Sequence, residues 1–215
     1  MKKQTLLSIF SLYFFILVVW SFYRYSFSLP EWLEEVIIKP LIWLTPTFLL
    51  VLYQEKKPLS SIGLSLSNFF KNIYFGWGLG ALFAFEGLIV NSIKYRGLLF
   101  IPVGLSIFDL MIMILISLAT AFSEELVFRG FILKRLNEIT KNALISNLIS
   151  AVLFSLIHLP IAIFVLKYDL SSLTSYLFLM LVLGIADGFV FDLTGTIVAP
   201  TISHALWNLS VILFR

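Results

Sequence analysis

Hydrophobic residues dominate seven long stretches of the chain, separated by short polar segments. A helix needs roughly 20 mostly apolar residues to cross about 30 Å of hydrocarbon, and these seven stretches meet or nearly meet that length. The pattern therefore predicts an all-α, polytopic membrane protein of about seven transmembrane helices. The predicted spans are residues 5–22, 37–53, 73–93, 105–128, 143–166, 173–191 and 196–214.

Composition supports the bilayer as the main solvent. The 215 residues are 60% hydrophobic and 13% charged, with a mean hydropathy of +1.02, whereas soluble domains carry about 25% charged residues. So much apolar surface cannot be hidden inside a particle of this size, which excludes a water-soluble globule and a disordered chain. The net charge of +3 is spread over loops and forms no basic face, so the expected partner is membrane lipid, with no nucleic acid.

The chain is expected to form a single membrane domain over residues 1–215. Residues 1–100 carry less specific helices, and the candidate chemistry lies in residues 105–214. With the amino terminus in the cytoplasm, nine basic residues lie on that side and five outside, while Lys39 stays inside a span. Because cytoplasmic loops are enriched in Lys and Arg, the sequence predicts a cytoplasmic amino terminus and, in a bacterium, the cell membrane.

Three charged residues lie close together at the end of the fourth predicted span. Glu124 and Glu125 are adjacent, so they point about 100° apart on a helix, whereas Glu125 and Arg129 are spaced i, i+4 with the acid first. We therefore expect Glu125 to pair with Arg129 and Glu124 to point elsewhere. Charged side chains at bilayer depth are costly and usually face a bundle interior or a hydrated cavity.

The protein has only two histidines, and each lies in an apolar span. His158 follows Phe154 by four residues in the fifth predicted span. His204 and Asn208 share one face of the seventh, because they are also four residues apart. Two histidines, an asparagine and a glutamate on separate hydrophobic spans would each carry a burial cost, which indicates a shared function. By contrast, Asn147 and Asp187 are expected to form hydrogen bonds between helices.

These residue types suit the attack of water on an amide. The chain has no cysteine, no GxSxG serine elbow and no HExxH zinc helix. Glu124 is a candidate general base, His158 a group that orients the water, and His204 with Asn208 a donor pair for an oxyanion. The alternative is a zinc site with Glu124, His158 and His204 as ligands and water in the fourth position. We expect the metal-free arrangement, with no cofactor.

The pattern Glu124-Glu125-xxx-Arg129, Phe154-xxx-His158 and His204-xxx-Asn208 resembles the three signature motifs of the CPBP family. This family groups the CAAX prenyl proteases of the Rce1 type with bacteriocin-processing or Abi proteins. The resemblance covers roughly residues 105–214. It implies an intramembrane endopeptidase whose helical core encloses a conical polar cavity opening toward the cytoplasm.

By similarity, Glu124 activates water together with His158, and His204 and Asn208 form the oxyanion site. Glu125 and Arg129 shape the first motif, and Phe154 packs one turn before the His158 ring. The implied substrate is a peptide or protein, prenylated or bacteriocin-related. Two other readings use the same residues: a non-catalytic self-immunity protein that binds a bacteriocin, and an ion-coupled transporter with buried Glu and His as a relay.

Overall fold

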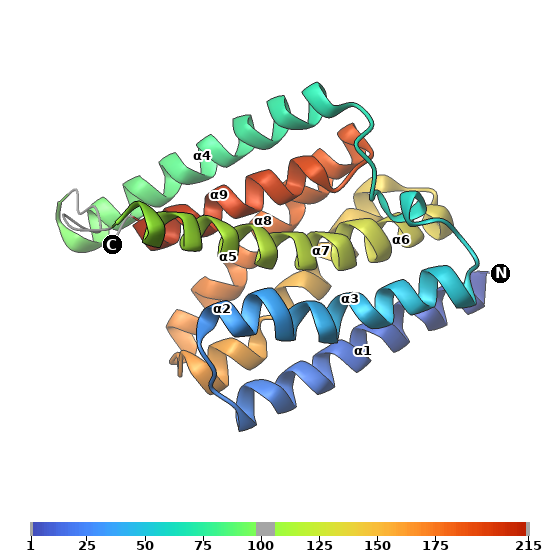
Figure 1. Cartoon of the computed structure of the whole chain (residues 1–215), viewed down its shortest axis with the longest axis horizontal. Helices are drawn as coiled ribbons and strands as arrows, with labels where there is room; N and C mark the ends of the chain where they lie inside the picture. Colours follow the sequence, from blue (N-terminus) through green and yellow to red (C-terminus); the bar gives the residue numbers. More distant parts are fainter. Residues whose placement is uncertain (1, 98–105, 214–215) are drawn as a thin grey trace.

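The protein is a bundle of helices that run roughly side by side (Figure 1). The computed structural model describes residues 2–97 and 106–213, and all regular structure within these two ranges is helical. The predicted fold class is therefore confirmed. The described helices are α1 (Lys2–Ser26), α2 (Glu31–Leu33), α3 (Lys39–Leu49), α4 (Phe69–Tyr95), α5 (Ile107–Glu125), α6 (Lys134–Thr140), α7 (Ala143–Leu156), α8 (Leu170–Thr194) and α9 (Val198–Leu213).

Four π-helical segments and one 3-10 turn complete the described chain. They are η1 (Glu34–Ile38), η2 (Leu50–Gln54), η3 (Leu59–Ile62, the 3-10 turn), η4 (Leu126–Leu133) and η5 (Ile161–Val165). The π segments extend neighbouring α-helices into longer rods. α5, η4 and α6 together form one continuous helical segment over Ile107–Thr140.

Six helical segments of the described chain are long and apolar enough to cross a membrane. The apolar α9 makes a shorter seventh. They correspond one to one with the seven predicted spans, but residues 105 and 214, where two of the predicted spans begin or end, lie outside the described ranges. The protein is a multi-pass membrane protein. The spans are Lys2–Ser26, Glu31–Gln54, Phe69–Ile93, Ile107–Thr140, Ala143–Val165 and Leu170–Thr194.

The fifth predicted span is not the uninterrupted helix that its hydrophobicity suggested. α7 ends at Leu156, and His158 lies in a turn before the π-helical η5 begins at Ile161. Pro160 explains the interruption, because its ring lacks an amide N–H and clashes with the preceding turn of a helix. His158 therefore lies at the break between two helical segments.

α9 occupies a central place in the bundle. It lies along α4 and also contacts α5 and α8, while α7 packs along α8 (Figure 1). α1 and α3 cover the other side of α5 and η4. Arg129, Phe128 and Phe131 are all at most 1% exposed, and every residue of η4 is buried, so η4 is the buried axis that the other helices surround.

Gly130 permits a close approach between this axis and the η3 turn. A Cβ atom at Gly130 would lie 2.5 Å from the backbone oxygen of Ile62, which is too close for two non-bonded atoms. We expect Gly130→Ala to lower the free energy of unfolding by about 1–3 kcal/mol, because η3 must move away from η4. Gly78→Ala is the matched control, since a Cβ atom there meets nothing within 4 Å. Thermal unfolding in detergent measures both, and equal stability of the two variants would contradict this packing.

Candidate active site

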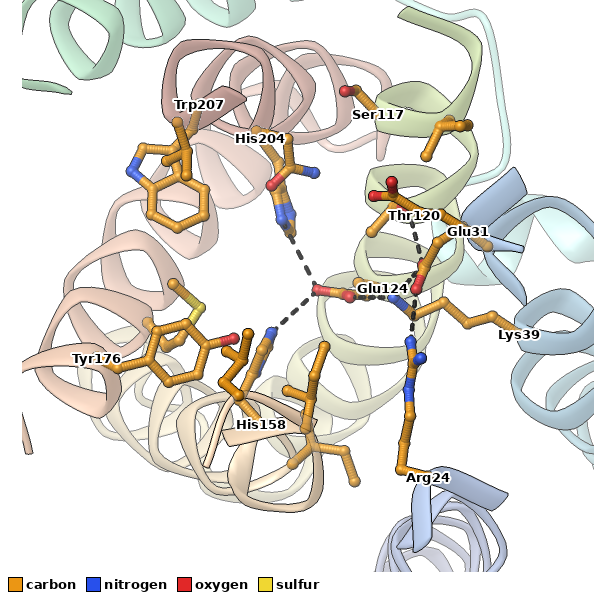
Figure 2. Close-up of a pocket in the computed structure, with 18 of the residues that line it drawn as sticks. Arg24, Glu31, Lys39, Ser117, Thr120, Glu124, His158, Tyr176, His204 and Trp207 are labelled. Carbon is orange, nitrogen blue, oxygen red and sulfur yellow. Dashed lines mark hydrogen bonds and ion pairs between the residues drawn. The ribbon is translucent and has the colours of Figure 1, made fainter. Parts of the chain in front are cut away.

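A cavity of about 310 Å³ lies between α1, α3, α5, α8 and α9 and holds the candidate residues (Figure 2). Its walls are largely aromatic and apolar, and its polar lining includes Glu124, His158, His204 and Asn208. The structure thus brings to one pocket four side chains that come from three different spans. They converge on a volume large enough for several water molecules or part of a peptide.

Glu124 is at the centre of this arrangement and is only 3% exposed. Its Oε1 atom accepts a hydrogen bond of 2.6 Å from the Lys39 ammonium. Its Oε2 atom lies 3.6 Å from Nε2 of His158 and 3.7 Å from Nε2 of His204, and it accepts no hydrogen bond from the described residues. Figure 2 shows both imidazole rings pointing at this carboxylate. One oxygen is therefore fixed by a cation, and the other faces two imidazoles.

The His158 ring is oriented by its own backbone. Nδ1 lies 2.8 Å from the carbonyl oxygen of Phe154, and a carbonyl can only accept, so Nδ1 carries the proton. In the neutral ring, Nε2 then presents a lone pair toward Glu124. The side chain is 12% exposed, because the turn before Pro160 places the ring on the cavity wall.

His204 belongs to a second, deeper charged cluster. Its Nδ1 atom lies 2.8 Å from Oε1 of Glu125, and the same oxygen is 2.9 Å from Nη1 of Arg129 in an ion pair. Nη2 of Arg129 is 4.0 Å from Asp187 and donates a hydrogen bond to the carbonyl oxygen of Gly184. This cluster holds His204 from behind, so that Nε2 faces the cavity.

Phe154 fills the space between the two imidazoles. Its ring lies 4.8 Å from the His158 ring and 5.8 Å from the His204 ring, both in edge-on geometry. The Arg129 guanidinium lies 4.3 Å from the Phe154 ring centroid. Because Phe154 is fully buried, it fixes the separation of the two histidines and contacts the cation that holds Glu125.

A third group of charges reaches Glu124 from the first two spans. The Lys39 ammonium, which donates to Glu124, also donates to Oε2 of Glu35 at 2.7 Å. The other oxygen of Glu35 accepts a 2.8 Å hydrogen bond from Arg24, which is also paired with Glu34. We call Arg24, Glu34, Glu35, Lys39 and Glu124 the ionic chain; each of its members is at most 7% exposed. It links α5 to α1, η1 and α3 through adjacent opposite charges.

Local helix geometry places these groups. Glu35 and Lys39 are spaced i, i+4 across η1 and the start of α3. The Thr120 hydroxyl on α5 donates a 2.9 Å hydrogen bond to Oε2 of Glu35, the oxygen that also binds Lys39. Glu125 is the last residue of α5, so Arg129 lies in η4, where the helix widens. π-helical turns often occur at functional sites. Here the wider π-helical turns begin directly after Glu125. Glu124 faces the cavity, whereas the Glu125–Arg129 pair is buried.

Two sets of residues have donor types that suit a metal ion. In the part of the chain that the structure describes, the one group of three ligand atoms within 4.8 Å of one another is Glu125, Asp187 and His204. The Arg129 guanidinium already supplies the positive charge there, so this group does not fit a cation. In the expected zinc set, Oε2 of Glu124 lies 3.6 Å from Nε2 of His158 and 3.7 Å from Nε2 of His204, near the roughly 3.3 Å between ligands of a tetrahedral zinc ion. The set does not have all three ligand atoms within 4.8 Å of one another, so the two imidazoles are too far apart for that geometry as they lie.

Residues 106–210 match the family described as type II CAAX prenyl endopeptidase, Rce1-like. Over this segment, which is just under half of the chain, the protein is similar to the Rce1-like family. The family is one of CAAX-type intramembrane proteases, which are hydrolases. Neither the curated proteins nor the solved structures provide a significant match to the chain.

The Rce1-like segment does not contain all of the pocket. Lys39, Glu35 and Arg24 precede it, and sequence reasoning did not assign them to the site. The sequence contains two indications of their role: Lys39 lies inside a predicted span, and Glu35 precedes it by four residues. Asp187 on α8 was expected to bond between helices, and it lies 4.0 Å from Arg129 on η4, within the cluster that joins these helices. Asn147 does bond between helices, because its amide donates 2.9 Å to the carbonyl oxygen of Ile185 on α8.

Arg129 compensates two carboxylates that are fully buried, Glu125 and Asp187. We expect Arg129→Met to lower the free energy of unfolding by about 3–5 kcal/mol, because removing one member of a buried ion pair leaves an uncompensated charge. The double variant with Glu125→Gln should recover part of this loss. Unfolding in detergent measures both.

The control is Lys57→Met, which removes a cation from an ion pair whose two side chains are 42% and 44% exposed. It should change stability by less than about 1 kcal/mol. If Arg129→Met were no more destabilising than Lys57→Met, Arg129 would not stabilise the fold by compensating Glu125 and Asp187.

Proposed function

We propose that this Rce1-like protein is an intramembrane endopeptidase in which Glu124 activates a water molecule. The observation that carries the proposal is the Oε2 atom of Glu124, which accepts no hydrogen bond from the described residues and faces Nε2 of His158 at 3.6 Å inside a cavity. Water between these two acceptors can donate one hydrogen bond to each. Its oxygen lone pair is then directed away from both and toward a bound peptide carbonyl.

In this mechanism Glu124 removes a proton from the water as the water oxygen attacks the carbonyl carbon. The same carboxyl group then returns that proton to the amine as the peptide C–N bond breaks. His158 holds the water with the lone pair of Nε2, because its Nδ1 proton is engaged by the Phe154 carbonyl oxygen. No covalent enzyme intermediate is required.

We assign the oxyanion site to His204 and Asn208, which line the pocket one helical turn apart on α9. The donor role requires a proton on Nε2 of His204, whose Nδ1 is held by Oε1 of Glu125 at 2.8 Å. Nε2 of that ring donates into the cavity, as the side-chain amide of Asn208 can. Such preorganised donors stabilise the charge that develops on the carbonyl oxygen.

Lys39 is proposed as a positioning residue for Glu124. Its ammonium binds Oε1 and leaves Oε2 as the basic atom, and Glu35 holds the ammonium from the opposite side. This cation also favours the metal-free mechanism. A zinc ion on Glu124, His158 and His204 would bind the same carboxylate that Lys39 already neutralises, and two cations at one carboxylate repel each other. Were zinc bound there, it would polarise water as a Lewis acid.

We propose that the protein is located in the cell membrane of a bacterium, with its amino terminus in the cytoplasm. The basis is the positive-inside distribution of Lys and Arg. Bacteriocin maturation, with cleavage of a membrane-associated peptide, is the finer function that we propose for this fold.

We expect Glu124→Gln to abolish cleavage, by about 10³-fold or more, because the amide cannot accept the proton of the water. The substrate is found by mass spectrometry of membrane-associated peptides in cells that carry the wild-type or the Glu124→Gln protein. Peptides that are cleaved only by the wild type are then assayed with purified protein. His158→Ala should also abolish turnover.

Glu138→Gln is the matched control, since this glutamate lies on the same helical rod with 44% of its side chain exposed. The Glu138→Gln protein should cleave the peptide at the wild-type rate. Identical peptide profiles for wild type and Glu124→Gln would overturn the protease assignment. Retained protection of the cell against a bacteriocin by Glu124→Gln would favour the binding role instead.

For Lys39, we expect a loss that the conservative variant rescues. Lys39→Met should lower kcat by roughly 10²-fold, with a smaller change in KM, because Glu124 loses its fixed orientation. Lys39→Arg retains a cation between Glu35 and Glu124 and should recover most of the activity, and Lys57→Met should be unaffected. If Lys39→Met lowers stability and leaves kcat of the folded protein unchanged, the lysine is structural only.

A further inference from the structure

One carboxylate on the wall of the pocket has no cation beside it. Glu31 is the first residue of α2, is exposed and lines the cavity. Among the side chains that the structure describes, no Lys or Arg forms an ion pair with Glu31, whereas Glu35, one turn further along, is paired with both Arg24 and Lys39. An acid in the first turn of a helix is slightly stabilised by the helix dipole, but that effect does not require the side chain to line a pocket.

The charges on this side of the pocket do not balance. The two cations of the ionic chain, Arg24 and Lys39, are each held between two of its three carboxylates. Glu31 raises the number of carboxylates to four. The exposed Lys167 lines a separate hollow with Glu34 and does not line this cavity. The group is therefore net negative, and a cationic ligand would compensate it better than a neutral or anionic one.

A second polar group in the pocket also has no partner. Ser117 on α5 is 2% exposed and lines the cavity, and its hydroxyl makes no hydrogen bond with any described residue. It precedes Thr120 by three residues and Glu124 by seven, which places all three on one face of the helix. A buried hydroxyl without a partner costs free energy. Ser117 is therefore available to bind a group that enters the pocket.

The wall opposite Glu31 is aromatic. Figure 2 shows Glu31 and Thr120 on one side of the pocket and Tyr176 and Trp207 on the other. Lysine and arginine side chains combine an apolar stem with a cationic head. The head can bind a carboxylate and can also pack against the face of an aromatic ring. The two walls together thus suit a basic side chain.

The position of Glu31 also sets a distance from the proposed reaction centre. Glu31, Glu35 and Lys39 follow one another at intervals of four residues, and Lys39 binds Glu124. Eight residues of helix span about 12 Å, and an extended peptide advances about 3.3 Å per residue. A peptide whose scissile carbonyl lies at Glu124 therefore has a residue beside Glu31 about three or four positions away.

We propose that Glu31 binds a Lys or Arg side chain of the peptide substrate and is a specificity-determining residue of the pocket. The cleavage step rests on the proposed function, but the binding of the basic residue does not. Ser117 binds the polar backbone of the same peptide segment. The substrate class is an apolar peptide that carries a basic residue about three or four positions from the bond that is cleaved.

The test uses peptides that differ in a single charge. The probes are fluorescent decapeptides of Ala, Leu and Ser with one central Lys, Arg, Gln or Glu, and they are acetylated and amidated to remove the terminal charges. Full-length protein with Glu124→Gln binds them without turnover. It is held in nanodiscs of zwitterionic lipid, because anionic headgroups attract basic peptides by themselves. Fluorescence anisotropy measures the affinity, and empty nanodiscs give the background.

We expect the Lys and Arg peptides to bind at least about 5-fold more tightly than the Gln peptide, as for one partly exposed ion pair, and the Glu peptide to bind most weakly. Glu31→Gln should remove this preference, Glu31→Asp should retain it, and Glu31→Lys should reverse it in favour of the Glu peptide. A purely structural role of Glu31 would not produce the reversal. Glu138→Gln is the matched control, because it removes an exposed charge outside the pocket and should keep the preference.

Equal binding of the four peptides, or no measurable binding of the Lys and Arg peptides, would overturn the inference. A preference that survives in Glu31→Gln, or that Glu138→Gln also removes, would overturn it as well. The proposed function is tested separately by peptide profiles in cells. Charge-selective binding with identical profiles for wild type and Glu124→Gln would leave the Glu31 subsite standing and overturn the protease assignment. Glu124-dependent cleavage without a charge preference would do the opposite.

Discussion

The structure depends on the compensation of carboxylates that the bilayer and the bundle remove from water. An ionised carboxylate in a low-dielectric interior costs several kcal/mol unless a cation and further hydrogen bonds offset the loss of hydration. Glu124 is compensated by Lys39, and Glu125 by Arg129. These two pairs are adjacent in sequence but face different directions, so one glutamate becomes part of a cavity wall and the other part of the packed core.

Because the Glu124 and Glu125 side chains face different surroundings, they can take different chemical roles. Glu125 has a cation, an imidazole and packed side chains around it, and its side chain is completely buried, so it can only orient its neighbours. Glu124 retains one oxygen without a hydrogen-bond donor among the described residues, in a volume that water can enter. The rigid aromatic contact of Phe154 with both imidazoles keeps that oxygen between them. A preorganised site of this kind requires little rearrangement when a peptide binds.

The sequence predicted the number of spans and the fold class, because apolar length in a bilayer is a local property of the chain. It also predicted the Glu125–Arg129 pair, since i, i+4 spacing requires only a helix. It could not predict that Lys39 pairs with Glu124, because these residues are separated by 85 positions and no local rule relates them. The sequence shows Pro160, which predicts an interruption of the helix. It does not show that His158 would line the pocket, because that depends on how the chain continues after the interruption.

The most direct test of the central claim is an experimental structure in lipid at a resolution that shows ordered water. We predict density for a water molecule within about 2.6–3.2 Å of both Oε2 of Glu124 and Nε2 of His158, with the Lys39 ammonium on Oε1. A metal ion at about 2.0–2.2 Å from Glu124 and both imidazoles would contradict the metal-free mechanism. Separation of Glu124 from both imidazoles by more than about 10 Å, beyond the reach of a single bridging water, would contradict the site itself.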